Sequence, residues 1–194
     1  MSRQEELSPG EFCLLALLCE HQSHGWSLAT MLARDGEIGA IWSIARPLVY
    51  TGLRRLETEG MIVTTGLERG QRGPHRVIYG PTAAGRKAVK QWLLDPVEHV
   101  REIRSLFLLK VVLAQRLGLD PKPLLEAQRA LMTPFVAWLE ARLDDVDPEL
   151  EPTEATVLFF RLETAQTTVR FIDHMLEVGK PAKASRGKSK NASK

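Results

Sequence analysis

The sequence predicts a mainly α-helical protein that contains one small β-hairpin. Apolar residues recur at helical spacing along most of the chain, whereas two neighbouring stretches, residues 61–67 and 76–82, are rich in strand-forming residues. The residues between these stretches include two glycines and a proline, as a hairpin loop requires. We therefore expect a small mixed domain near the N-terminus, followed by an entirely helical region.

The composition is that of an ordinary globular protein. Of its 194 residues, 44% are hydrophobic and 26% are charged. No apolar run approaches the roughly 20 residues that cross a bilayer, and the first residues lack the pattern of a secretory signal. We expect a cytoplasmic protein that has no membrane partner.

The charges are unevenly distributed, although the net charge is only +2. Residues 95–179 carry 9 basic and 15 acidic side chains, and residues 180–194 carry 6 basic side chains and no acidic one. Between residues 46 and 90, nine basic side chains face three acidic ones. A basic segment in an otherwise acidic protein is typical of a surface that binds a phosphate backbone.

The start of the first helix is indicated by several sequence signals. Ser8 can cap it, Pro9 suits its first position, and Glu11 completes a capping box, while Leu7 and Phe12 can pack as a hydrophobic staple. The body that follows is apolar nearly all round. We expect this helix to be buried on several sides, by its own core and by a second subunit.

Two shorter helices are expected next. One covers residues 26–34, and the other begins near residue 44 or 45 and carries Val49, Leu53 and Leu56 on its buried side. Gly60 ends this third helix, and Gly52 within it is interpreted as a close-packing position against the preceding helix.

Three helices followed by a strand, a basic loop and a strand are the layout of a winged helix-turn-helix, in which the third helix enters the DNA major groove. Thr82 then caps a further helix that breaks at Asp95 and Pro96. The winged domain is accordingly expected over residues 1–94.

The same segment resembles the winged-helix domain of the PadR family of bacterial transcriptional regulators. The resemblance covers about residues 7–94 and rests on an ordered set of residues: Trp42, Tyr50, Leu53, Leu56, Glu57, Gly60, Tyr79, Thr82 and Gly85. It implies a homodimeric repressor bound to a double-stranded DNA operator, and in some members release by phenolic acids or flat aromatic drugs. The chain departs from the family pattern at Ala45-Arg46-Pro47, where relatives commonly have a Ser-Pro-Gly type of start. This places Arg46 at the end of the helix that approaches DNA.

The predicted DNA-binding residues lie on the third helix and on the wing: Arg46, Tyr50, Thr51, Arg54, Arg55, Arg69, Arg72 and Arg76. The alternative for the helix is a solvated face on which Arg55 pairs with Glu59. A second alternative is a winged-helix module that binds another protein and has no specific DNA binding.

The chain beyond residue 95 is predicted to form three helices, over residues 103–117, from Pro121 or Pro123 to about residue 144, and from Pro152 onward. We expect residues 95–179 to form a helical domain for dimerisation and effector binding. Four aromatic residues are candidates for an effector site between subunits, although packing in a core is the alternative for each: Trp92, Phe107, Phe135 and Trp138. Residues 180–194 are expected to be a disordered basic tail that either tethers DNA or only solubilises the protein.

Enzymatic and metal-dependent functions have little support in the sequence. No Walker loop, nucleophile elbow or zinc-protease motif is present, and His21 and His24 have no third ligand nearby. Cys13 and Cys19 lie on different sides of one helix and are interpreted as small buried hydrophobic residues. We expect a regulator with no cofactor and no metal.

Overall fold

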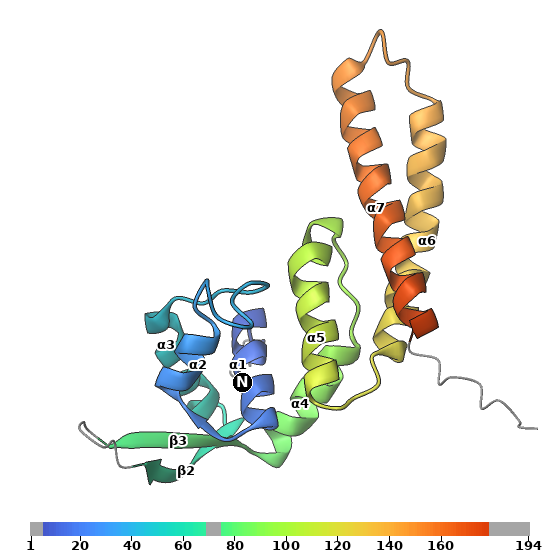
Figure 1. Cartoon of the computed structure of the whole chain (residues 1–194). Coiled ribbons are helices and arrows are strands. Elements are labelled where there is room, and N and C mark those ends of the chain that lie inside the picture. Colours follow the sequence, from blue (N-terminus) through green and yellow to red (C-terminus); the bar gives the residue numbers. More distant parts are fainter. Residues whose placement is uncertain (1–5, 69–74, 179–194) are drawn as a thin grey trace, which may run out of the picture.

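Helix α1 (Pro9–Glu20) lies at the centre of the N-terminal part of the protein. The computed structural model describes residues 6–68 and 75–178, and a long hairpin of two helices extends away from the remainder (Figure 1). Ser8 and Glu11 form the predicted capping box, since each side chain binds the other residue's backbone N–H. The fold is mainly α-helical with a small antiparallel sheet, as the sequence predicts.

The burial of α1 comes from its own chain. Residues 13–18 are at most 3% exposed, because α3, α4, α5 and strand β3 all pack against this helix. The expectation that a second subunit completes this burial is therefore unnecessary for these residues. Both cysteines are unpaired thiols, and burial raises the pKa of Cys13 to about 12.

Helix α2 (Gly25–Met31) is shorter than predicted, and a series of turns leads from it to α3 (Arg46–Thr58). Pro47 occupies the first turn of α3, where its missing N–H breaks no helical hydrogen bond. Gly60 follows the helix with a φ of 68°, a conformation that is costly for other residues. The predicted start and end of the third helix are thus confirmed.

The sheet has three strands: β1 (Ser23–His24), β2 (Ile62–Glu68) and β3 (Arg76–Pro81). Strand β3 lies between the other two, and both pairings are antiparallel. The predicted hairpin of β2 and β3 is confirmed. The two-residue strand β1 was not predicted, because so short a segment shows no alternation of polar and apolar residues.

Helix α4 (Ala83–Leu94) begins at the predicted cap, where Thr82 accepts a hydrogen bond from the Gly85 N–H. A 3₁₀ turn (Val100–Glu102) and a π-helical turn (Ile103–Phe107) then lead into α5 (Leu108–Arg116). Leu109 and Leu113 of α5 belong to the same hydrophobic core as α1 and α3. Part of the region after residue 95 therefore packs on the winged domain, and the division at residues 94 and 95 stays a prediction.

Helices α6 (Lys122–Asp144) and α7 (Pro152–Val178) pair along their length and form the extended hairpin (Figure 1). One core lies between them around Leu139 and Leu158. A separate core near the base of the hairpin joins Phe107 to Leu125 and Ile172. Among residues 6–68 and 75–178, no helix is long and apolar enough to span a membrane.

Candidate nucleic-acid interface

The exposed side of α3 is mostly polar, while its inner side is fixed to the core. Val49, Leu53 and Leu56 are at most 1% exposed, so the rotation of the helix about its axis is set by packing. Four of the predicted DNA-binding residues lie exposed on this helix: Arg46, Tyr50, Thr51 and Arg54.

Two glycines allow α3 to lie very close to its neighbours. A Cβ atom on Gly52 would be 2.8 Å from Cδ1 of Leu14, so this glycine permits contact with α1. A Cβ atom on Gly25, at the start of α2, would be 2.6 Å from the Tyr50 ring. The interpretation of Gly52 as a close-packing residue is confirmed, although its partner is α1 and not the preceding helix.

Arg55 differs from the other predicted contacts because its guanidinium faces α1. Nη1 of Arg55 lies 3.2 Å from both carboxylate oxygens of Glu11, and Nη2 donates to the carbonyl of Glu6. The same Glu11 carboxylate accepts hydrogen bonds from the backbone N–H and hydroxyl of Ser8. Arg55 therefore ties α3 to the capped end of α1, and this pairing with Glu11 replaces the alternative pairing with Glu59.

The arginine one residue earlier points along the exposed side of the helix. Arg54 Nη2 donates to the Thr51 hydroxyl at 3.5 Å, and that hydroxyl in turn donates to the carbonyl of Pro47. These are contacts between exposed groups of one helix, which solvent or a phosphate can replace at little cost.

At the base of the wing, Arg76 lies beside α2. Its guanidinium carbon is 5.3 Å from the ring centroid of Trp26, a cation–π distance, and its Nη1 is 3.3 Å from Nε2 of His24. His24 accepts the Ser27 N–H at Nδ1 and so caps α2, while its Nε2 lies 3.5 Å from Glu68. Arg69 and Arg72 lie outside the described residues.

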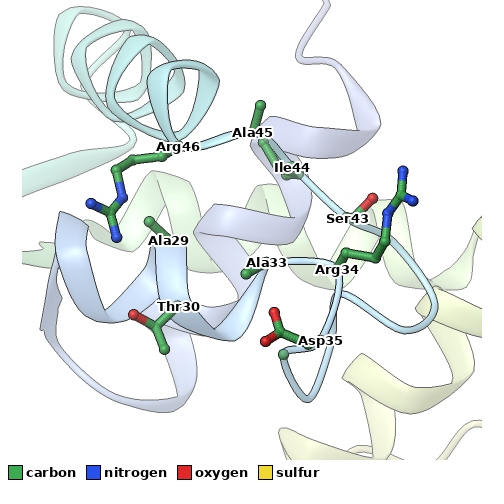
Figure 2. A pocket seen from close by; sticks show the side chains of 10 residues that line it. Ala29, Thr30, Ala33, Arg34, Asp35, Ser43, Ile44, Ala45 and Arg46 are labelled. Carbon is green, nitrogen blue, oxygen red and sulfur yellow. The ribbon is translucent and has the colours of Figure 1, made fainter.

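A cavity of about 600 Å³ lies between α2 and the beginning of α3. Figure 2 shows Arg46 at one end of this cavity and Arg34 and Asp35 at the other. Thr30 and Ser43 add hydroxyl groups to its lining. The sequence analysis did not identify Arg34 and Thr30 as residues of this cavity, because the turns that place residues 34 and 46 around it show no periodic pattern.

The four aromatic residues predicted for an effector site lie in three separate places. Trp92 is buried against Phe12, with the two rings stacked at a centroid distance of 4.9 Å, and Phe107 is buried in the core at the base of the hairpin. Phe135 and Trp138 stack on each other on α6 at 5.8 Å. Within one chain the four therefore do not line a common cavity.

Trp92 has a buried cation beside it. The ammonium of Lys110 is 4.8 Å from the Trp92 ring centroid and donates to the carbonyl of Asp95 at 2.7 Å. Burial lowers the pKa of Lys110, although the nearby carboxylates of Asp95 and Glu102 oppose this effect. Lys110 thereby fixes the segment that follows α4.

Comparisons with known proteins give a match for the N-terminal part of the chain, which includes α3 and the wing. Residues 14–91 match the family model described as the transcriptional regulator PadR-like family. Residues 14–91 belong to this family. The description of the family is that of transcriptional regulators, and the match covers this segment of the chain. A comparison with curated protein sequences gave no match.

Several solved structures of PadR-like proteins match most of the chain at low sequence identity. Bacillus subtilis PadR in complex with operator DNA is 17% identical, with a TM-score of 0.46, over 90% of this chain and 99% of that chain. The same protein in complex with p-coumaric acid is 20% identical, with a TM-score of 0.40, over 88% and 98%. The PadR-like regulator BC1756 from Bacillus cereus is 20% identical, with a TM-score of 0.39, over 91% and 99%.

Within residues 6–68 and 75–178, no group of three histidine, cysteine or acidic side chains is placed to hold a metal ion. His24 uses its ring nitrogens for the cap of α2 and for contacts with β2 and β3. This assigns His24 a structural role between the helix and the wing.

Proposed function

We propose that this protein is a homodimeric repressor that binds a double-stranded DNA operator through α3 and the wing, and that a small aromatic molecule releases it. The observation that carries the proposal is the exposed side of α3. Arg46 and Arg54 lie on it together with Tyr50 and Thr51, and the helix has no acidic residue before Glu57. A helix of this kind fits the major groove, where arginine binds guanine edges and phosphates.

The wing adds to the same surface. Arg76 is exposed at the first residue of β3 and lies against Trp26 of α2, so it connects the wing to the helix-turn-helix. Arg69 and Arg72 stand between β2 and β3 in the sequence, outside the described residues, and we keep both among the proposed phosphate contacts. Arg55 also remains a proposed residue of the interface, although it acts from its position on Glu11.

The hairpin of α6 and α7 supports the proposal of a homodimer. Six large apolar side chains on its two helices are between 43% and 70% exposed: Leu131, Trp138, Val157, Phe159, Phe160 and Val178. Exposed apolar residues in this number indicate an interface, and a second copy of the chain is the partner we propose. A two-fold dimer would present two α3 helices to half-sites about 34 Å apart.

Of the four candidate aromatic residues, Phe135 and Trp138 are the two that we propose to contact the effector. Their rings are nearly parallel, with an angle of 17° between them, and Trp138 is about half exposed. A flat aromatic ligand can extend such a stack at the proposed interface between subunits. Trp92 and Phe107 are buried in this chain, so we propose for them a supporting role in the two cores.

The DNA-binding proposal is tested with Arg54→Ala. We expect about tenfold weaker binding to duplex DNA, and a plot of log Kd against log salt whose slope falls by about one unit, because one phosphate contact is lost. Fluorescence anisotropy at several salt concentrations measures both quantities. Arg161→Ala, which removes an exposed arginine from α7, is the matched control and should bind as the wild type does.

The alternative function, a module that binds another protein without specific DNA binding, predicts a different result. In that case the wild type and both arginine variants would bind every duplex equally weakly. Repression is then tested by transcription in vitro from a promoter that contains the bound sequence. Release of the protein from DNA is tested by adding phenolic acids and planar drugs, and these should release Trp138→Ala less than the wild type. Sedimentation of the same samples tests whether the protein is a dimer.

A further inference from the structure

We propose that Leu48, together with Pro47, reads the methyl group of a thymine in the DNA major groove and so sets part of the sequence preference. This inference rests on the proposed binding of DNA by α3. It assigns a specificity role to two residues that have no polar side-chain atom.

Leu48 is an exposed residue at the beginning of α3. It lies in the first turn of α3, two residues after Arg46, and its side chain is 61% exposed. Val49 beside it is completely buried, so the helix cannot rotate to hide Leu48. A single exposed leucine is ordinary on a protein surface, but the first turn of a recognition helix is the part that reaches base edges.

The surroundings of Leu48 leave it available to a ligand. It lines a cavity of about 310 Å³, to which Trp42 and Ile44 contribute apolar side chains and Glu11 and Thr51 contribute polar ones. The apolar part of this lining comes from the turn before α3 and from the first turn of the helix. The first turn of α3 therefore presents a cation, Arg46, on the side towards α2 and an exposed leucine on the side towards α1.

The chemistry of this surface limits what it can recognise. Pro47 and Leu48 offer no side-chain donor or acceptor, and the nearby Thr51 hydroxyl already donates to the Pro47 carbonyl at 3.1 Å. Among the four bases, only thymine exposes an apolar group in the major groove, its C5-methyl. Contact with that methyl is the one form of base discrimination open to these side chains.

The size of the effect follows from the burial of one methyl group. Removing a buried carbon of this kind costs about 0.8 kcal/mol, which corresponds to about a fourfold change in Kd for each half-site. An effect of this size is easily measured, and it should not depend on salt, because no charge is involved.

Deoxyuridine provides a test that changes only the methyl. A duplex that the full-length wild-type protein selects from a random pool is prepared with each thymine replaced in turn by deoxyuridine, and Kd is measured by anisotropy. We expect about fourfold weaker binding at one thymine of each half-site. Leu48→Ala should bind the thymine duplex about as weakly as the wild type binds the deoxyuridine duplex, with no further loss on the latter.

Two further variants make the result specific to this position. Leu48→Met keeps an apolar side chain of similar length and should retain most of the sensitivity to the thymine methyl. Leu150→Ala removes a leucine that is 79% exposed in the turn between α6 and α7, and it should bind as the wild type does. Equal melting temperatures for the three variants would show that the comparison concerns recognition and not folding.

The outcomes separate this inference from the proposed function. If the wild type selects a duplex and no thymine-to-deoxyuridine change matters, or if Leu48→Ala keeps the full sensitivity, the reading of a methyl by Leu48 is wrong while DNA binding stands. If the wild type binds no duplex at all, the proposed function fails, and this inference fails with it.

Discussion

The N-terminal part and the α6–α7 hairpin differ in how completely their own residues bury their apolar surface. In the N-terminal part, α1 is surrounded, and Leu14, Leu15 and Leu18 are at most 1% exposed. In the hairpin, two helices share a core around Leu139, yet Phe160 remains 70% exposed. A helical pair can bury only the facing side of each helix, whereas a helix at the centre of several elements is covered all round.

Because of this difference, we expect the stability of the two parts to respond differently to dilution and to mutation. The N-terminal part has the burial of a unit that is stable as a single chain. The hairpin has exposed apolar residues on both of its helices, and covering them with a second copy is the most direct way to remove that surface from water. The following variants are chosen to contradict or refine this contrast.

The largest effect is expected from truncating the two cores separately. Leu53→Ala and Leu139→Ala each remove a side chain that is at most 1% exposed, and each should lower the free energy of unfolding by about 2–5 kcal/mol. Thermal unfolding at protein concentrations a hundredfold apart distinguishes them. The shift caused by Leu139→Ala should grow on dilution if the hairpins associate as proposed, whereas the shift caused by Leu53→Ala should stay constant.

Equal shifts at all concentrations for both variants would contradict the contrast between the two parts. They would show that the hairpin is as self-sufficient as the N-terminal part. A conservative control in each core, Val49→Ala beside Leu53 and Met132→Leu beside Leu139, should give smaller losses with the same concentration behaviour.

A smaller effect is expected from the ion pair between Arg55 and Glu11. Arg55→Met should cost about 1–3 kcal/mol of stability, since it leaves a largely buried carboxylate without its charged partner. DNA binding should weaken because α3 loses an attachment to α1. The slope of log Kd against log salt should nevertheless stay close to that of the wild type, in contrast to the slope for Arg54→Ala.

The salt dependence decides between two roles for Arg55. If the slope for Arg55→Met is lower than that of the wild type by about one unit, Arg55 contacts a phosphate, as Arg54 is proposed to do. The exchange variant Glu11→Arg with Arg55→Glu tests the other role, because restoring the pair in reverse should recover part of the stability lost by either single change.

Much of this architecture can be predicted from local sequence signals. The capping box at Ser8, the start of α3 just before Pro47 and its end at Gly60 are each encoded within a few residues. The capping box and the end are as predicted, and the helix begins at Arg46, within two residues of the predicted start. The hairpin of β2 and β3 follows from composition alone. The family resemblance stated from the sequence agrees with the match over residues 14–91.

The sequence does not predict contacts between residues that lie far apart in the chain. Arg55 has Glu59 four residues away on the same helix, yet it binds Glu11, which lies 44 residues away and is fixed there by its own role as a cap. The aromatic residues Trp92 and Phe107 fit a ligand site by type, yet the structure places them in two separate cores. Periodicity identifies which side of a helix is apolar, but it does not say which partner covers it.

The smallest effect is expected from two ion pairs that lie in the two parts. Arg116 on α5 binds Glu20 at the end of α1 at 2.8 Å and also contacts Glu37, whereas Arg142 and Glu154 form a more exposed pair in the hairpin at 2.7 Å. The hydrogen bond with Glu20 raises the pKa of Arg116 above its ordinary value. A raised pKa in the folded state stabilises the fold at every pH below that of the unfolded side chain, so a measurement at pH 7 captures the arginine's whole contribution.

Double-mutant cycles measure the coupling energy of each ion pair and so compare one interaction in the N-terminal part with one in the hairpin. We expect a coupling energy of about 1 kcal/mol for Arg116 with Glu20, which lie between two packed helices, and no more than about 0.5 kcal/mol for Arg142 with Glu154, because solvent screens that pair. Urea unfolding of the four variants of each cycle gives both values. If the hairpin pair couples as strongly as the pair on α5, Arg142 and Glu154 are shielded from solvent in the assembled protein, and the proposed subunit interface must extend to that end of the hairpin.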